Sequence, residues 1–226
     1  MMNTEELKDY CLSKPKAVET YPFGDWPICF KVHNKIFAQI YADKITLKCT
    51  AFSGQAFRAA YPGIVVRGYH CPPVQQPYWN TIDLTRFPHE ELPMMIDHAY
   101  HTVVSSFSKK VQREILYGDI LGRTVTVTID RPLGSCHPKH PDIYYSVNYG
   151  YIEGIIAPDG EEQDAYILGV DIPLQTFTGE VIAVIHRKDD VENKWVVAPE
   201  GMTFSQEEIE ELTRFQERYF DSEVII

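Results

Sequence analysis

Long apolar runs are missing from this chain of 226 residues. No stretch approaches the roughly 18 to 20 apolar residues of a membrane-spanning helix. The first residues also lack the charged-then-apolar order of a signal peptide. Cysteine is scarce: the five are odd in number, and no two are spaced as Cys-x-x-Cys. We therefore expect reduced thiols in a cytoplasmic protein, no membrane association and no zinc site of the Cys-x-x-Cys kind.

Clusters of basic residues are absent as well, and the charge is divided unevenly along the chain. Residues 1–113 hold 13 Lys/Arg and 10 Asp/Glu, whereas residues 114–226 hold 8 and 22, so the balances are +3 and −14 within a net charge of −11. Such asymmetry indicates two modules with different partners. We place the boundary within residues 108–117 and predict domains at 1–112 and 117–226. Nothing in the sequence indicates an oligomeric state.

The acidic half reads as short strands followed by one helix. Residues 123–130 alternate valine and isoleucine with threonine, which is typical of a half-buried strand. Further strands are predicted at 149–156, 165–170, 180–186 and 195–197. A closing helix is predicted at 205–220, where Ser205 and Glu208 form a capping box. Five strands and a helix favour a small Greek-key barrel of the OB type.

The N-terminal half has a different pattern. Helices are predicted near residues 4–13 and 53–60, with a long one ending near 107. Strands are predicted at 28–32, 35–41, 44–49 and 79–83, the first two joined as a hairpin across His33-Asn34. Helix, meander and helix predict an α+β sandwich, so the fold class expected for the whole chain is α+β.

A dense carboxylate cluster follows the second predicted strand of the acidic half. Asp159, Glu161, Glu162 and Asp164 lie within six residues, and Pro158 and Gly160 favour a turn that would gather their side chains. Hard cations such as Mg²⁺ prefer oxygen ligands of this kind. An isolated cluster of this sort is more often a solvated acidic turn, so both interpretations are open at this point.

The surrounding residues favour the metal. Asn148-Tyr-Gly-Tyr-Ile152, then Asp159-Gly-Glu161 and Asp164, and then an apolar strand follow one another in an order and spacing that resemble the family I soluble inorganic pyrophosphatases. That resemblance implies an OB-type barrel and Mg²⁺- or Mn²⁺-dependent hydrolysis of pyrophosphate or a related phosphoanhydride by the C-terminal domain. The N-terminal domain would then be an accessory binding domain.

The resemblance also implies roles for single residues. Glu161 would take the proton from the attacking water, and phosphate oxygens would contact Lys194, Tyr149 and Tyr219. The implied metal ligands are Asp159, Asp164, Glu192 and Asp189, with Asp190 as the alternative to Asp189.

Departures from that family concern the phosphate-binding side of the site. The segment 128–145 is shorter than in the family, which carries a Glu, a Lys and an Arg there. Asp130 stands near the position of the missing Glu, and Phe220 stands where the family has a Lys. The candidate sources of positive charge are Arg131, Lys139, Arg187, His137 and His140. The alternative function is therefore a non-catalytic binding or regulatory protein with a decayed pyrophosphatase site and an N-terminal domain that binds DNA or a protein.

The N-terminal half resembles the MmcQ/YjbR family, whose fold is like that of CyaY and frataxin. The residues that carry this resemblance are Lys14-Pro-Lys-Ala-Val-Glu19, Tyr21-Pro-Phe-Gly24, Phe30-Lys-Val32, Tyr61-Pro-Gly63, Gly68-Tyr-His70 and Trp79-Asn-Thr81. The family is often described as DNA-binding, so DNA is a candidate partner. Lys31, Lys35, Lys44 and Lys48 lie beside aromatic residues that would stack on bases, although lysines on the solvent face of a sheet are the commoner explanation. His98 and His101 lack further ligands and predict no metal site.

Overall fold

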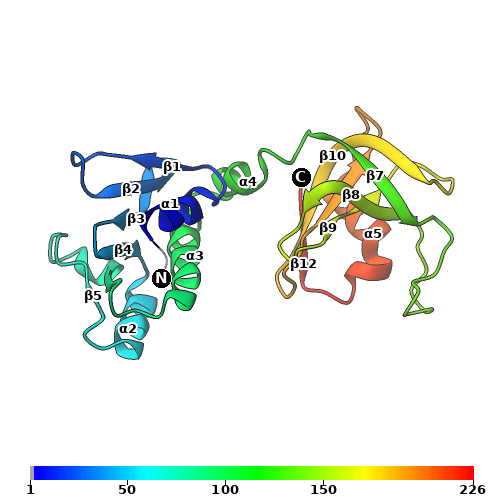
Figure 1. Cartoon of the computed structure of the whole chain (residues 1–226). Coiled ribbons are helices and arrows are strands. Elements are labelled where there is room, and N and C mark those ends of the chain that lie inside the picture. Colours follow the sequence, from blue (N-terminus) through cyan, green and yellow to red (C-terminus); the bar gives the residue numbers. More distant parts are fainter. Residues whose placement is uncertain (1–2) are drawn as a thin grey trace. The chain divides into compact units, whose positions relative to one another are not determined.

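The computed structural model describes residues 3–226 (Figure 1). The chain divides into two compact units, and the division falls between Leu116 and Tyr117. None of the helices in the described part is long and apolar enough to span a membrane.

The N-terminal unit is a six-stranded antiparallel sheet with helices. The strand order is β1-β2-β3-β4-β6-β5. The strands are β1 (Ala17–Thr20), β2 (Ile28–Val32), β3 (Lys35–Ile40), β4 (Lys44–Lys48), β5 (Val65–Arg67) and β6 (Trp79–Asp83). The helices are α1 (Thr4–Leu12), α2 (Ala51–Ala60), α3 (Leu92–Val104) and α4 (Lys109–Tyr117), with short 3₁₀ turns at Gln76–Tyr78 and His89–Glu91.

One face of this sheet packs on α1 and α3. In α3, Leu92, Met95, Ile96, Ala99 and Val103 recur at helical spacing and are at most 2% exposed. They share one core with Leu7 and Cys11 of α1 and with alternate residues of the strands. The predicted hairpin across His33-Asn34 is confirmed, with His33 at a positive φ of 54°.

The C-terminal unit is a five-stranded barrel with one added strand. The barrel strands are β7 (Thr124–Arg131), β8 (Asn148–Ile156), β9 (Glu162–Ile167), β10 (Thr176–Arg187) and β11 (Lys194–Ala198). They pair in the cyclic order β7-β8-β9-β11-β10 and back to β7, and only β9 and β11 are parallel. This order is the Greek-key closure of an OB-type barrel, so the predicted fold class is confirmed.

Helix α5 (Gln206–Glu217) and strand β12 (Ser222–Ile225) complete this unit. Ser205 caps α5, and its capping box with Glu208 is confirmed. Ile209 and Phe215 of α5 pack on Tyr145, Tyr149 and Tyr166 in the barrel core. Strand β10 is long because its first half pairs with β7 and its last residues pair with β12.

Gly150 lets β7 and β8 approach at the point where the candidate site lies. A Cβ atom at this position would lie 2.0 Å from the carbonyl oxygen of Thr128. No larger residue fits there without displacing backbone, so this glycine sets the position of Tyr149 relative to the end of β7.

Candidate functional site

Lys194 stands at the start of β11, beside the strand that carries Asp164. The parallel register pairs Trp195 with Ala165 and thereby brings the preceding residues of both strands together. The Lys194 ammonium lies 2.6 Å from Asp164 Oδ2 and also contacts Glu192. Lys194 is only 4% exposed, so its charge is neutralised by these two carboxylates within the barrel wall.

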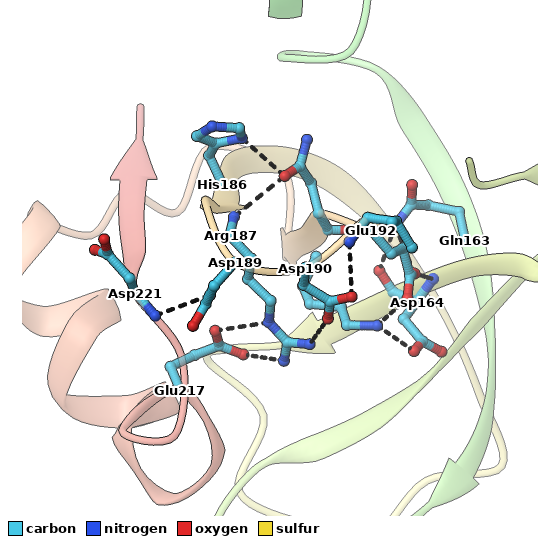
Figure 2. Close-up of polar contacts among 12 residues, drawn as sticks. Gln163, Asp164, His186, Arg187, Asp189, Asp190, Glu192, Glu217 and Asp221 are labelled. Carbon is cyan, nitrogen blue, oxygen red and sulfur yellow. Dashed lines mark hydrogen bonds and ion pairs between the residues drawn. The ribbon is translucent and has the colours of Figure 1, made fainter. Parts of the chain in front are cut away.

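Glu192 is held in place by the backbone as well as by Lys194. Its Oε1 accepts hydrogen bonds from the Asp164 backbone N at 3.1 Å and from Gln163 Nε2 at 3.3 Å (Figure 2). Burial raises the pKa of this carboxyl, Lys194 opposes the rise, and the charge of Asp164 adds to it. The sequence-predicted residues Asp164, Glu192 and Lys194 are thus brought together.

Tyr149 joins the same group from β8. Its hydroxyl donates to Asp164 Oδ2 over 2.6 Å, so this one oxygen accepts from both Tyr149 and Lys194. Tyr149 is 1% exposed, and burial raises the pKa of its hydroxyl well above the ordinary value. The phenol therefore stays protonated and acts as a donor.

Arg131, the last residue of β7, supplies the positive charge on the other side of Tyr149. Its guanidinium lies 5.1 Å from the ring centroid of Tyr149 and 5.9 Å from that of Tyr145, and 3.6 Å from the Asp130 carboxylate. We name the group of Asp130, Arg131, Tyr145, Tyr149, Asp164 and Lys194 the Arg131–Lys194 site.

Two buried polar atoms of this site, Arg131 Nε and the hydroxyl of Tyr145, have no hydrogen-bond partner of ordinary geometry among residues 3–226, although the two side chains lie within reach of each other. Tyr145 is fully buried, whereas the Arg131 side chain is 25% exposed. Leaving a buried donor unpaired costs about 1–3 kcal/mol. The site therefore has hydrogen-bonding capacity that the described residues do not use.

Asp130 is a carboxylate with a perturbed pKa beside this arginine. Burial raises its pKa, Arg131 opposes the rise, and the negative charge of Asp164 adds to it. The resemblance places Asp130 near a missing Glu of the family, and in the structure Asp130 belongs to the Arg131–Lys194 site through its contact with Arg131.

Asn148 and Tyr145 are contributors that the sequence analysis missed. The fully buried Asn148 side chain accepts from the backbone N of Leu133 and of Leu174, each at 3.0 Å, and donates to the Ile172 carbonyl at 2.9 Å. It thereby fixes the chain that follows Arg131. The Asn-Tyr-Gly-Tyr motif was visible in the sequence, but the role of its asparagine depends on two loops distant in sequence.

Several predicted residues lie elsewhere. Asp159 and Glu161 are exposed in the β8–β9 turn, where Asp159 accepts from the Glu161 backbone N at 3.0 Å. Asp189 accepts from the Asp221 backbone N at 3.0 Å. Tyr219 is 52% exposed, and its hydroxyl accepts from Arg218 at 2.7 Å. Lys139 lies in the loop of His137, to which its backbone N donates.

Arg187, a predicted phosphate ligand, is fully engaged inside the protein (Figure 2). Its Nε and Nη2 donate to the two oxygens of Glu217 at 3.0 and 2.6 Å, and its Nη1 donates to Asp190 at 2.9 Å. The guanidinium also lies 3.6 Å from the ring centroid of Phe220. With 3% exposure, Arg187 is not placed to meet a phosphate.

The predicted Mg²⁺ ligands do not fit a metal in this arrangement. Within residues 3–226, no three His, Cys, Asp or Glu side chains form a group that could hold a metal ion. The two predicted ligands that do meet, Asp164 and Glu192, both contact the Lys194 ammonium.

The fold and this site define a protein of two units: an α+β sandwich and an OB-type barrel with a tyrosine-lined site of paired charges. A family model described as YjbR matches residues 12–102. The Deinococcus radiodurans protein DR2400 is 26% identical, with a TM-score of 0.46, over 51% of this chain and 88% of its own. No curated protein matches the chain.

Solved structures of inorganic pyrophosphatases are also similar to part of the chain. The Neisseria gonorrhoeae enzyme is 21% identical, with a TM-score of 0.37, over 46% of this chain and 80% of its own. The Ehrlichia chaffeensis enzyme is 17% identical, with a TM-score of 0.37, over 46% and 86%. The N-terminal part thus resembles YjbR proteins, and the C-terminal part resembles inorganic pyrophosphatases.

Proposed function

We propose that the C-terminal unit binds pyrophosphate or a related phosphoanhydride at the Arg131–Lys194 site. The observation that carries this proposal is the Arg131 guanidinium, whose side chain is 25% exposed and whose Nε has no hydrogen-bond partner of ordinary geometry in the described part of the chain. A guanidinium presents its donors as a fork that matches phosphate oxygens. Phosphate oxygens are acceptors that suit these donors.

Calorimetric titration of the full chain with pyrophosphate tests this proposal. Arg131→Ala should weaken binding by about tenfold to a hundredfold, since a hydrogen bond to a charged group contributes roughly 1.5–3 kcal/mol. Arg131→Lys keeps the charge but loses the forked arrangement of donors. Its affinity for pyrophosphate should lie between those of the unaltered chain and Arg131→Ala. Lys188→Ala removes one cation from an exposed pair with Asp221 in the same unit and is the matched control. Equal affinities for the Arg131→Ala variant and the unaltered chain would reject the proposal.

Hydrolysis of the bound phosphoanhydride is the second candidate function, and the raised pKa of Asp130 favours it. We propose that the Asp130 carboxylate accepts the proton of a water whose oxygen attacks phosphorus. The P–O–P bond then breaks, and the departing phosphate keeps the bridging oxygen. A carboxylate of raised basicity performs this role better than an ordinary aspartate.

Phosphate release, measured with and without Mg²⁺ or Mn²⁺, tests the hydrolysis. Asp130→Asn should keep pyrophosphate binding and lower turnover by about a hundredfold or more, the scale of general-base removal. Glu161→Gln is the comparison, because the sequence assigns the proton acceptor to Glu161. If Glu161→Gln loses turnover while Asp130→Asn keeps full activity, the proton acceptor is Glu161 and not Asp130.

DNA binding by the N-terminal unit is a separate candidate, favoured by one groove. This groove has a volume of about 710 Å³ and is lined by Lys31, Lys35, Lys48, Tyr78 and Trp79, among others. The Lys48 ammonium lies 4.8 Å from the Trp79 ring centroid and 5.7 Å from that of Tyr78. Cations beside aromatic faces are the arrangement that single-stranded nucleic acids use.

Fluorescence anisotropy with labelled single-stranded DNA tests this candidate. Affinity should fall steeply with salt and should drop in Lys48→Ala, because phosphate contacts release counterions. Lys44→Ala, at the other end of the same strand, is the control. Binding that is insensitive to both salt and Lys48→Ala would remove DNA as the partner of this groove.

A further inference from the structure

A hollow in the C-terminal unit is lined by His137, whose ring lies beside Tyr145 of the Arg131–Lys194 site. It has a volume of about 380 Å³ and lies between the loop that carries His137, His140 and Ile143 and the segment after α5 that carries Tyr219 and Phe220. We name it the His137–Tyr219 pocket. Its size falls in the range of pockets that enclose small organic ligands.

His137 connects this pocket to the Arg131–Lys194 site. Its ring is nearly parallel to that of Tyr145, with an interplanar angle of 16° and 6.4 Å between centroids. Burial and the nearby Arg131 charge both lower the pKa of His137, so the imidazole is neutral at pH 7. A ligand whose phosphates reach Arg131 can therefore extend past a neutral aromatic ring into the pocket.

The lining of the pocket does not suit a further phosphate. It contains no lysine or arginine, and Asp142 contributes a carboxylate. Three of its rings belong to His137, His140 and Tyr219, and Ile143 and Phe220 add apolar surface. A flat, neutral group that stacks on rings matches this lining.

We infer that the phosphoanhydride is a nucleoside diphosphate, whose base occupies the His137–Tyr219 pocket while its phosphates contact Arg131. This inference rests on the proposed function, because it assigns the substrate class of the same site. The aromatic lining distinguishes this ligand from inorganic pyrophosphate, which leaves the pocket empty.

Calorimetry of the full chain with ADP, GDP, CDP, UDP and inorganic pyrophosphate tests the inference. At least one nucleoside diphosphate should bind about tenfold or more tightly than pyrophosphate, the scale of one stacked base. Tyr219→Ala and His140→Ala should bring the ratio of the two affinities close to one. Tyr144→Ala removes a tyrosine that is 54% exposed and does not line the pocket, and it should keep the ratio.

Each remaining outcome has a defined meaning. If pyrophosphate binds as tightly as every nucleotide, the inference is overturned and the proposed function stands. If neither pyrophosphate nor any of the nucleotides binds, both the inference and the proposed function are overturned. If a nucleotide preference persists in both Tyr219→Ala and His140→Ala, the base lies elsewhere and the assignment of the pocket is overturned.

Discussion

Two arginines of the C-terminal unit show why residue type alone could not locate the site. Arg131 and Arg187 both end strands of the same barrel, and the sequence offered both as phosphate ligands. The structure saturates Arg187 with Glu217 and Asp190, whereas Arg131 keeps an unpaired donor. The difference depends on Glu217, which lies 30 residues further along in α5. Such long-range pairing is invisible to local sequence patterns.

The buried pair of Arg187 and Glu217 should therefore be structural. Arg187→Ala leaves the carboxylate of Glu217 buried at 7% exposure with only the Tyr166 hydroxyl as its partner. Breaking such a pair costs about 3–5 kcal/mol of unfolding free energy. Urea denaturation measures this loss. Lys188→Ala, which breaks the neighbouring exposed pair with Asp221, is the control and should leave the unfolding free energy nearly unchanged. Similar losses in both variants would contradict the prediction.

Because of Cys49, the unfolding free energy of the N-terminal unit should fall at alkaline pH. The thiol is 3% exposed, and burial raises its pKa from 9.0 to about 11. Above pH 9 the unfolded thiol ionises while the folded one keeps its proton, so this contribution is complete below pH 9 and is lost as pH rises towards 11. At pH 10 the unfolding free energy that Cys49 contributes should be lower by about 1.4 kcal/mol than at pH values below 9.

Urea denaturation at pH 8 and pH 10 checks this loss by comparison with Cys49→Ala, in which the Cys49 contribution disappears. Cys136→Ala, at an exposed cysteine, should keep the full dependence. An identical pH dependence in the unaltered chain and Cys49→Ala would show that the folded thiol ionises normally.

At the scale of elements, the sequence predicted the segments that show a clear hydrophobic period. It did not predict very short strands or the ends of strands that are extended by long-range pairing. The β7 alternation, the β2–β3 hairpin and the α5 capping box are all present as predicted. Strands β1, β5 and β12 were missed because each has only three or four residues, too few to show a period. Strand β10 begins four residues earlier than predicted, at Thr176, since pairing with β7 extends it.

The Ser205 cap should support α5 and, through Ile209 and Phe215, the barrel core. Its side chain accepts from the Glu208 backbone N at 3.2 Å, while the Glu208 side chain accepts from the Ser205 backbone N at 2.7 Å. Ser205→Ala should lower the unfolding free energy by about 1 kcal/mol. Thermal or urea unfolding measures this change. Gln206→Ala, one residue further on, removes an exposed contact with Glu210 and should cost less than half as much. If both variants lose the same unfolding free energy, Ser205 does not stabilise α5 as a cap.

At the scale of the whole chain, the sequence predicted two modules from charge and placed the boundary within 108–117. The structure forms α4 in this segment and divides the chain after Leu116. Val111, Ile115 and Leu116 of α4 pack against the core of the N-terminal unit. Charge could not show this, because the position of the division depends on the side on which three apolar residues are buried.

The N-terminal unit should consequently need α4 for its stability. A fragment of residues 1–112 lacks Ile115, which is 4% exposed, and Leu116, and it retains only the first turn of α4. A fragment of residues 1–116 keeps both side chains. Burying each contributes roughly 1.5–3 kcal/mol, so the shorter fragment should be less stable by about 3 kcal/mol in urea denaturation. Glu114→Ala in the longer fragment alters an exposed residue of the same helix and should have little effect. Equal stability of the two fragments would mean that α4 does not belong to this core.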